Sequence, residues 1–457
     1  MDDHDVLHEI VAHAERFLDG LPERPVGSTA TVDELWTALN GPLPMEGLDD
    51  RTVVTDLMKS AESGLVATAG PRFFGFVIGG STPASLAADW LTTLWDQNAG
   101  LVAAGPAAAV VEEIAGEWLK ELLALPKDAS FAMVTGCQMA NFVGMLAARH
   151  QVLTDHGWNV EADGLQGSPT IAVVAGEERH ATMDRALRFA GLGAPKVLVP
   201  ADDQGRMRAD ALRDAVAGID GPMIVCAQAG NVNTGAFDPL DEICDITHAR
   251  GGWVHVDAAF GLWAAVSPRL MHLLKGHDKA DSWATDAHKW LNVPYDSGLV
   301  FCAHPKTHRA STGISASYLL KSAAREEMEY TPESSRRARA FPIYAAVRAL
   351  GRAGIVEMVE RCCDLALRFA DQLSAQPDVD VLNDVVLNQV LVRFGDDDER
   401  TRRVIDNVQR DGTCWLGGST WKGQAVMRIS LSNWSTTAED VDRSVEAIIR
   451  AARAVGG

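Results

Sequence analysis

Three residues with reactive or charged side chains follow short apolar segments in the middle of the chain. His180 comes shortly after TIAVV, Asp257 ends WVHVD, and Lys289 follows SWAT in the stretch DAHKW. A lysine amine condenses with a carbonyl group, and a buried aspartate needs a cation opposite it. These residue types therefore suit a ligand that carries a carbonyl group and a ring with a basic nitrogen.

A fourth segment, VTGCQMAN at residues 134–141, adds a candidate phosphate-binding turn. The pattern predicts a strand, a turn of small residues and the start of a helix, where free backbone N–H groups attract anions. Gly136 allows a close approach, and Cys137 and Gln138 complete the turn. Taken alone, each of the four segments also has a plain structural explanation, such as a helix cap or β–α packing.

Taken together, the four segments favour one ligand, pyridoxal phosphate. Lys289 would form the Schiff base with its aldehyde, and Asp257 would keep the pyridine nitrogen protonated. His180 would stack on one face of the ring, and Ala259 is small enough to lie flat against the other face. The turn at residues 136–138 would hold the phosphate.

Hydrophobic patterning predicts the elements that must position these residues. Helical segments such as 139–150, 209–218 and 240–250 separate most of the apolar runs. Apolar strands that alternate with helices indicate a largely parallel sheet covered on both faces, and ligands of such sheets bind beyond the carboxyl ends of the strands. All four segments fall at such ends. The predicted strands are 131–135, 170–174, 196–200, 223–227, 253–257, 282–285 and 298–302.

The flanking regions suggest three parts for the 457-residue chain. We expect an N-terminal helical arm at 1–84, a large α/β domain at 85–340 and a small α+β C-terminal domain at 341–457. The arm has apolar residues at helical spacing and is too small to act alone. It should pack on something larger.

Composition excludes several classes of protein. The formal net charge of −21 argues against nucleic acid and anionic membranes as partners. No apolar run reaches membrane-spanning length, and MDDHDVLHEI lacks the cationic start of a signal peptide. The seven cysteines are scattered without a CxxC pair, which favours a reduced, cytoplasmic protein. No metal site is expected.

The chain also resembles the group II pyridoxal-phosphate-dependent amino-acid decarboxylases. The resemblance extends from PRFFGF (71–76) to TTAEDVDRSVEAI (436–448), and its most specific parts are HVDAAF (255–260) and DAHKW (286–290). His180 and the stretches GAFDPLDEI and RRARA also match. This family has the aspartate-aminotransferase fold, fold type I, so the resemblance implies a mainly parallel seven-stranded sheet in the large domain. It also implies a homodimer with the active site at the interface.

The resemblance assigns further positions around the cofactor. His288 is expected on the substrate side, Asp286 in the cofactor pocket, and Asn231 near the ring hydroxyl and the Schiff-base edge. Two stretches depart from the family pattern. GNVNTG stands where the family usually has Thr near position 231, and Cys137–Gln138 stand where Ser or Thr is common. An amide donates a hydrogen bond to phosphate as a hydroxyl does, so phosphate binding is still expected.

Resemblance implies that the bond broken is the one to the α-carboxylate, because the enzyme selects a bond by its orientation to the ring. Tyr330, in the charged stretch 321–340, is the expected proton donor on a flexible loop, and the alternative is a rim tyrosine with His288 or water as the donor. Arg428 is expected to be structural. The residues expected to line the substrate side-chain site are Phe76, Val77, Ile78 and Trp95, an apolar set that favours an aromatic or aliphatic amino acid.

Other functions of the same fold remain open at this stage. One is another carbon–carbon lyase, either like sphingosine-phosphate lyase or of the aldolase type. A second is an aldehyde synthase that consumes O₂, although the presence of Tyr330 favours plain decarboxylation. A third is a non-catalytic cofactor carrier, which would have no need of Asp257.

Overall fold

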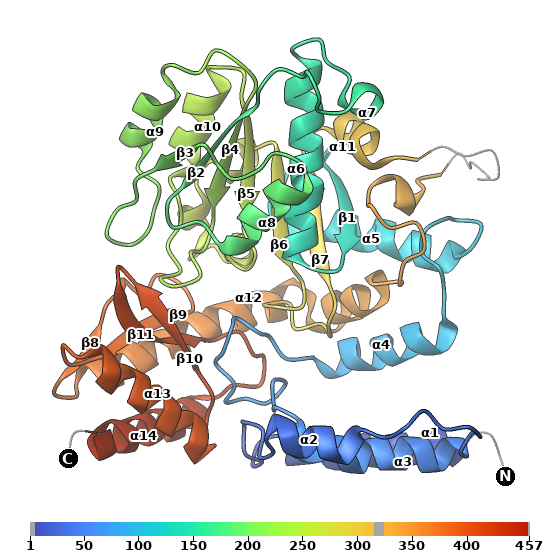
Figure 1. Cartoon of the computed structure of the whole chain (residues 1–457), viewed down its shortest axis with the longest axis vertical. Coiled ribbons are helices and arrows are strands. Elements are labelled where there is room, and N and C mark those ends of the chain that lie inside the picture. The colour runs from blue at the N-terminus through green and yellow to red at the C-terminus, as the bar shows by residue number, and fades with distance from the viewer. Residues whose placement is uncertain (1–4, 315–323, 456–457) are drawn as a thin grey trace.

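The computed structural model describes residues 5–314 and 324–455. Figure 1 shows a large sheet with its helices, a smaller sheet beside the C-terminus, and three helices along the lower edge near the N-terminus. Residues 321–323 of the charged stretch that we expected to form a loop lie outside the described residues. Within the described part of the chain, no helix is both long and apolar enough to cross a membrane.

The large sheet has seven strands in the order β1-β7-β6-β5-β4-β2-β3. The strands β3, β2, β4, β5 and β6 run parallel, and β7 pairs antiparallel with both β6 and β1. The expected mainly parallel, seven-stranded α/β fold is therefore confirmed. The strands are β1 (Ser130–Val134), β2 (Ala172–Gly176), β3 (Val197–Val199), β4 (Met223–Gln228), β5 (Trp253–Asp257), β6 (Ser282–Asp286) and β7 (Gly298–Cys302).

Both faces of this sheet are covered, which explains why its strands are apolar throughout. In β4, Val225 and Ala227 belong to the main core, whereas Ile224 and Cys226 belong to the cluster beneath α6 and α8. Helix α6 packs across β5, β6 and β7. The helices of this part are α5 (Pro106–Leu122), α6 (Cys137–Thr154), α7 (Val160–Asp163), α8 (Ala181–Phe189), α9 (Ala209–Val216), α10 (Leu240–His248) and α11 (Pro305–Thr312), with the short 3₁₀ helices η2 (Gly261–Val266), η3 (Met271–Leu274), η4 (His277–Lys279) and η5 (Glu327–Glu329).

A second, antiparallel sheet lies near the C-terminus, with the order β10-β11-β9-β8 (Figure 1). The long helix α12 (Ala340–Ser374) leads into it and packs on α4 (Pro83–Trp95), α5 and α14. Gly351, with φ +60°, interrupts the helical geometry of α12 and produces a kink. The remaining elements are β8 (Val379–Val381), β9 (Gln389–Phe394), α13 (Asp398–Asp411), β10 (Gly417–Trp421), β11 (Gln424–Ser430) and α14 (Ala438–Val455).

The N-terminal helices are α1 (Asp5–Gly20), α2 (Val32–Leu39) and α3 (Asp50–Ala61), followed by η1 (Glu62–Gly64). Local capping explains where two of them begin. Thr31 and Glu34 form a reciprocal capping box at α2, and Asp49 caps α3. None of the side chains in these three helices is buried. They lie as a thin layer along the lower edge of the molecule (Figure 1).

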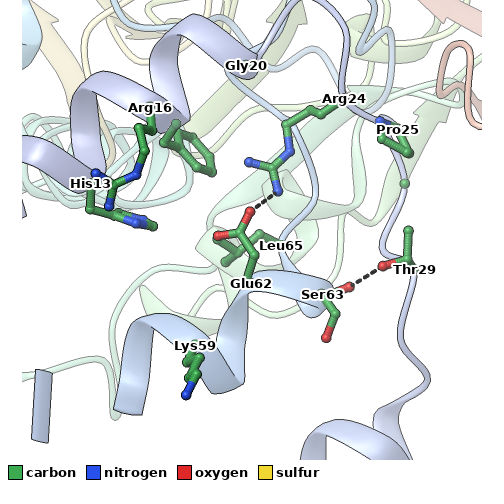
Figure 2. Close-up of a pocket in the computed structure, with 12 residues that line it drawn as sticks. His13, Arg16, Gly20, Arg24, Pro25, Thr29, Lys59, Glu62, Ser63 and Leu65 are labelled. Atoms are coloured by element: carbon green, nitrogen blue, oxygen red, sulfur yellow. Dashed lines mark hydrogen bonds and ion pairs between the residues drawn. The ribbon is translucent and has the colours of Figure 1, made fainter. Parts of the chain in front are cut away.

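A hollow of about 680 Å³ lies against this layer. Figure 2 shows two of its lining residues, Arg24 and Glu62, pointing toward each other, with their ion pair at 2.7 Å. Arg24 also lies over the ring of Phe17 at 4.6 Å. None of the predicted site residues borders this hollow.

Candidate active site

A cavity of about 390 Å³ opens at the carboxyl ends of the large sheet. It brings together predicted residues that are far apart in the sequence. Lys289 and His288 follow β6, Asp257 ends β5, His180 precedes α8, and the turn at 136–138 begins α6. The lining residues are Phe76, Gly136, Cys137, Gln138, His180, Thr182, Gln228, Gly230, Val232, Asp257, Ala259, Phe260, Asp286, His288, Lys289 and Arg428.

Lys289 is held at the cavity by Asp286. Its Nζ lies 3.2 Å from Asp286 Oδ2, and Asp286 Oδ1 accepts the Cys137 backbone N–H at 2.6 Å. Burial by itself would lower the pKa of the Lys289 ammonium, but the charge of Asp286, with a smaller contribution from Asp257, raises it overall. Asp286 therefore links the lysine to the turn predicted to bind phosphate.

Asp257 is buried at the end of β5 and faces hydrogen-bond donors. Asn141 Nδ2 donates to Oδ2 at 3.1 Å, and the Cys137 thiol and the Ala259 backbone N–H donate to Oδ1 at 3.4 and 3.3 Å. Donors on both oxygens fix the plane of the carboxylate. Burial, followed by the charges of Asp257 and Asp286, raises the pKa of the Cys137 thiol, which therefore stays protonated and can donate.

His180 both caps a helix and borders the cavity. Its Nδ1 accepts the Thr182 backbone N–H at 3.3 Å, so the imidazole caps α8, and the same nitrogen lies 2.7 Å from Thr182 Oγ1. The ring also borders the cavity. Burial lowers the pKa of His180, so near neutral pH the ring is neutral with its proton on Nε2.

His288 is locked in one tautomer. Its Nδ1 accepts the Ser297 backbone N–H at 3.0 Å, so the proton of the neutral ring lies on Nε2, 3.4 Å from Asp286 Oδ1. Burial lowers the pKa of His288. A neutral imidazole gives up this proton very reluctantly, so His288 suits hydrogen-bond donation better than proton transfer to carbon. The Tyr295 ring lies against it, with 4.2 Å between centroids.

The turn before α6 leaves a polar group without a partner. Both the Nε2 and the Oε1 of Gln138 are buried and have no hydrogen-bond partner among the described residues. The turn is also tightly packed, because a Cβ on Gly298 would lie 2.3 Å from the Gly136 backbone. A buried free amide at a helix N-terminus fits a phosphate group, so the residues present suit the expected cofactor.

Asn231, predicted near the cofactor, does not border the cavity. Its Oδ1 accepts backbone N–H groups from Asn233 and Thr234 at 2.8 and 3.2 Å, and its Nδ2 donates to the Glu178 carbonyl at 3.2 Å. Its neighbours Gly230 and Val232 do border the cavity. In this structure the Asn231 side chain shapes the turn that carries them.

Of the four residues predicted to line the substrate pocket, Phe76 alone borders this cavity. Val77 is buried in the main core, and Ile78 packs in the cluster around Phe73. Trp95 lies on α4 with its ring edge against Phe341, 5.0 Å between centroids.

Tyr330 does not border the cavity in a single chain. Its ring meets His308 edge-on at 5.2 Å, and the Arg325 guanidinium lies 4.3 Å over it. Arg325 also donates to the Phe131 carbonyl and pairs with Glu327, which anchors the segment that carries Tyr330.

Arg428, in contrast, does border the cavity. Its guanidinium donates to the Val232 carbonyl at 3.3 Å, and no carboxylate of the described residues pairs with it. Burial lowers its pKa. An unpaired guanidinium at the cavity can receive an anion.

Three residues around the site were not predicted, namely Asn141, His255 and Tyr295. One signal for His255 was present in the sequence. Because side chains of a strand alternate between the two faces, His255 must point to the same face as Asp257, two residues later. The contacts of Asn141 and Tyr295 depend on packing between separate elements and have no comparable signal.

This edge of the large sheet holds a lysine with an acidic partner, a buried aspartate, a histidine that borders the cavity and a helix start with a free buried amide. Such a set is typical of the pyridoxal-phosphate-dependent class of proteins. A family model described as "Pyridoxal-dependent decarboxylase conserved domain" matches residues 34–394. The chain therefore belongs to the pyridoxal-dependent decarboxylase family.

Individual relatives agree with this assignment. The chain is 26% identical over 443 residues to an aromatic-L-amino-acid decarboxylase of Bacillus atrophaeus, covering 93% of this chain and 90% of the relative. It is 31% identical to an acidic amino acid decarboxylase of Bos taurus, over 67% of this chain and 60% of the relative. The expected enzyme class, a pyridoxal-phosphate-dependent carboxy-lyase, is confirmed.

The fold also agrees with this family. The crystal structure of Oryza sativa TDC with PLP and tryptamine superimposes with a TM-score of 0.92 at 23% identity, covering 99% of this chain and 98% of the other. Its fold is shared, and pyridoxal 5'-phosphate is confirmed as the cofactor of the family.

Proposed function

We propose that this chain removes the α-carboxylate of an L-amino acid with an aromatic or aliphatic side chain and releases the amine. The observation that supports this substrate class is Phe76, a large apolar side chain that is 61% exposed on the cavity rim. Exposed apolar side chains at a cavity mouth favour contact with an apolar ligand group. Val232 and Phe260 add apolar lining.

The cofactor, when bound, accepts the electron pair that stays on the α-carbon as CO₂ leaves. Lys289 would hold the cofactor covalently, and Asp257 would keep the proton on its ring nitrogen. His180 and Ala259 would flank the ring. Gln138 and the N-terminus of α6 receive the phosphate, which gives the free amide of Gln138 a partner.

A second candidate substrate is an acidic amino acid. The observation in its favour is Arg428, whose guanidinium borders the cavity without a carboxylate partner among the described residues. A side-chain carboxylate of the substrate would supply that partner. The relative from Bos taurus that carries the name acidic amino acid decarboxylase agrees with this alternative.

An amino-acid panel separates the two candidates. The protein loaded with cofactor is given tryptophan, phenylalanine, leucine, glutamate and aspartate, and mass spectrometry measures amine, aldehyde and CO₂. We expect amines from the apolar substrates, with Phe76→Ala raising their KM. Turnover of glutamate or aspartate that disappears in Arg428→Met would instead establish the acidic substrate. Aldehyde as the main product would contradict simple decarboxylation.

Proton delivery to the α-carbon needs a donor other than His288, whose Nδ1 is occupied by the Ser297 N–H. Tyr295 is the phenol that we assign to this role within one chain. It is not among the residues that line the cavity, but its ring lies against the cavity residue His288, with 4.2 Å between centroids, and the residue is 56% exposed. In this step a C–H bond forms, the phenol O–H bond breaks, and water returns the proton. Tyr330, our expectation from the sequence, would have to reach the cavity of a second copy.

We further propose that the chain works as a homodimer. Most of the exposed large apolar side chains in the described residues lie between positions 7 and 114. The most exposed include Trp36 at 68%, Leu43 at 91% and Met45 at 99%. A monomer rarely leaves such a surface in water, so a second copy of this chain is the proposed cover.

The proposed location is a reducing compartment such as the cytoplasm. All seven cysteines are free and buried in the structure. Burial raises the pKa of Cys226, Cys302 and Cys414 to about 12, so these thiols have no role that needs a thiolate.

A further inference from the structure

A series of hydrogen-bonded, buried side chains leads away from Asp257 on the side opposite the cavity; we call Asn141, His255, Ser282 and Trp253 the relay. Asn141 lies on α6, His255 lies on β5 two residues before Asp257, and Ser282 begins β6. His255 Nε2 is 2.9 Å from Asn141 Oδ1, and His255 Nδ1 is 2.8 Å from Ser282 Oγ. Trp253 Nε1 donates to Ser282 Oγ at 3.0 Å. None of these groups borders the cavity.

The direction of every hydrogen bond in the relay follows from the groups at its two ends, the Asp257 carboxylate and the Trp253 indole. Asp257 as a carboxylate only accepts, so Asn141 turns its Nδ2 toward Asp257 and its Oδ1 toward His255. His255 must then donate from Nε2 and accept at Nδ1 from the Ser282 hydroxyl. Because the Trp253 indole only donates, all the donors point toward Asp257, and bonds aligned in this way polarise one another.

The electrostatics keep the negative charge at one end. Asn141, His255 and Ser282 are fully buried. Burial lowers the pKa of His255 to about 4, against the smaller opposing effect of Asp257, so its ring is neutral at physiological pH. The relay therefore supplies oriented dipoles to Asp257 without adding a neutralising positive charge.

The packing makes room for this arrangement. A Cβ on Gly144 of α6 would lie 2.4 Å from His255 Cε1 and 2.6 Å from its Nδ1. Helix α6 thus has no side chain at the point where the His255 ring passes beneath it. This observation is independent of the hydrogen bonds and agrees with them.

We propose that His255 is a positioning residue, which acts through Asn141 to hold the Asp257 carboxylate ionised and aimed at the ring nitrogen of the cofactor. This inference rests on the proposed role of Asp257 and deepens it. Without the relay, Asn141 is free to turn its amide oxygen toward Asp257, and the carboxylate loses both a donor and its fixed plane. The ring nitrogen would then hold its proton less strongly.

The test uses the intact protein loaded with ¹⁵N-labelled pyridoxal phosphate. The ¹⁵N NMR shift reports the protonation of the ring nitrogen, and titration of the apoprotein gives the dissociation constant of the cofactor. In His255→Phe we expect the ¹⁵N signal to move toward that of a neutral pyridine and cofactor binding to weaken roughly 10-fold, as for a lost hydrogen bond to a charged group. His255→Gln, whose amide can still donate to Asn141, should restore most of both.

Matched variants complete the design. His277→Phe also removes a buried histidine, one whose ring contacts the backbone carbonyls of Leu274 and Leu123, and it should leave the ¹⁵N signal unchanged. If His255→Phe does not fold, Ser282→Ala replaces it and should shift the signal in the same direction. An unchanged ¹⁵N signal in the folded relay variants overturns the relay while Asp257→Asn still shifts it. An unchanged signal in Asp257→Asn itself overturns the proposed role of Asp257 and the relay with it.

Discussion

The cavity at the large sheet and the N-terminal helices differ most clearly in how far one chain completes them. Around the cavity, Asp257, Asp286 and His288 are at most 8% exposed, and each is hydrogen-bonded to a neighbouring element. In α1, α2 and α3 no side chain is buried. The residues around the cavity are thus positioned by contacts within the chain, whereas the side chains of the N-terminal helices are not buried by the rest of the chain.

This contrast follows from how each region obtains its burial. The parallel strands carry apolar residues on both faces and are covered on both sides, so their carboxyl ends are held rigidly. The N-terminal helices are amphipathic, and α2 and α3 start from local caps, but a short helix gains most of its stability from packing its apolar face. Changes in the two regions should therefore have different consequences.

The largest effect is expected from Asp257→Asn, which alters the cavity and leaves the N-terminal helices unchanged. The amide keeps the shape of the side chain but loses the charge that, by our proposal, would face the ring nitrogen of the cofactor. In another enzyme, the same change at a buried aspartate bonded to a ring N–H costs roughly 10⁴-fold in kcat. We expect a loss of similar size, measured as amine formation, with the mass in solution unchanged. Near-normal turnover would contradict the assignment of Asp257.

The next largest effect, expected from Tyr295→Phe, tests whether one chain holds every group that the reaction needs. If Tyr295 delivers the proton, Tyr295→Phe should lower amine formation roughly 10²-fold or more, as for the loss of a general acid, and allow aldehyde to appear. Tyr330→Phe should then retain most of the activity. The reverse result would mean that Tyr330 acts across an interface, and the cavity of one chain would be incomplete after all.

A smaller effect is expected from Trp36→Asp, which alters the N-terminal helices and leaves the cavity unchanged. A charge in place of an aromatic anchor typically costs at least about 2 kcal/mol of association energy, or roughly 30-fold in the dimer dissociation constant. Light scattering across a dilution series measures this constant. Leu367→Asp is the control, because Leu367 is also an exposed apolar residue, at 45%, but lies on α12. Equal dissociation constants for the two variants would contradict the proposed interface.

The sequence predicted the sheet and the residues at its carboxyl ends because both depend on short-range patterns. Strands buried on both faces are recognisable, and their ends meet at one edge. The residues that line the substrate side of the cavity were predicted less well, for a local reason. Phe76 and Val77 have φ of +56° and +61°, a left-handed backbone that turns their side chains in directions no periodicity indicates.

The position of Tyr330 was equally hidden from the sequence. It depends on Arg325 stacking between Phe131 and Tyr330, at 4.3 Å from each ring. Phe131 belongs to β1, far away in the sequence, so composition alone suggested a flexible loop where the structure has an anchored segment.

The smallest effect concerns the end of the large sheet opposite the cavity. Asp281, at the start of β6, accepts hydrogen bonds from His248 and His304, each at 2.9 Å, and from the Val254 N–H at 2.7 Å. The hydrogen bond to Asp281 raises the pKa of His248. Burial opposes ionisation of Asp281, but the hydrogen bonds from the two histidines and Val254 outweigh it and lower its pKa.

The sign of the pH dependence follows from these two directions. The contribution of His248 is complete below its unfolded pKa of about 6.5 and is lost as pH rises through its raised folded pKa. The contribution of Asp281 is complete above about pH 4 and is lost as pH falls through its lowered folded pKa. The pair should therefore stabilise the fold most between about pH 4 and 6.5.

His248→Gln tests this window by urea denaturation at pH 5.5 and pH 8.5. Because His248 is 36% exposed, solvent screening limits the extra loss of unfolding free energy at the lower pH to about 0.5 kcal/mol. The control is His156→Gln, whose ring bonds the Val152 carbonyl and no carboxylate. An equal loss at both pH values would show that His248 contributes by packing and not by charge. The dimer dissociation constant should stay the same throughout, because His248 ends α10 and Asp281 directly precedes β6, both outside the N-terminal helices.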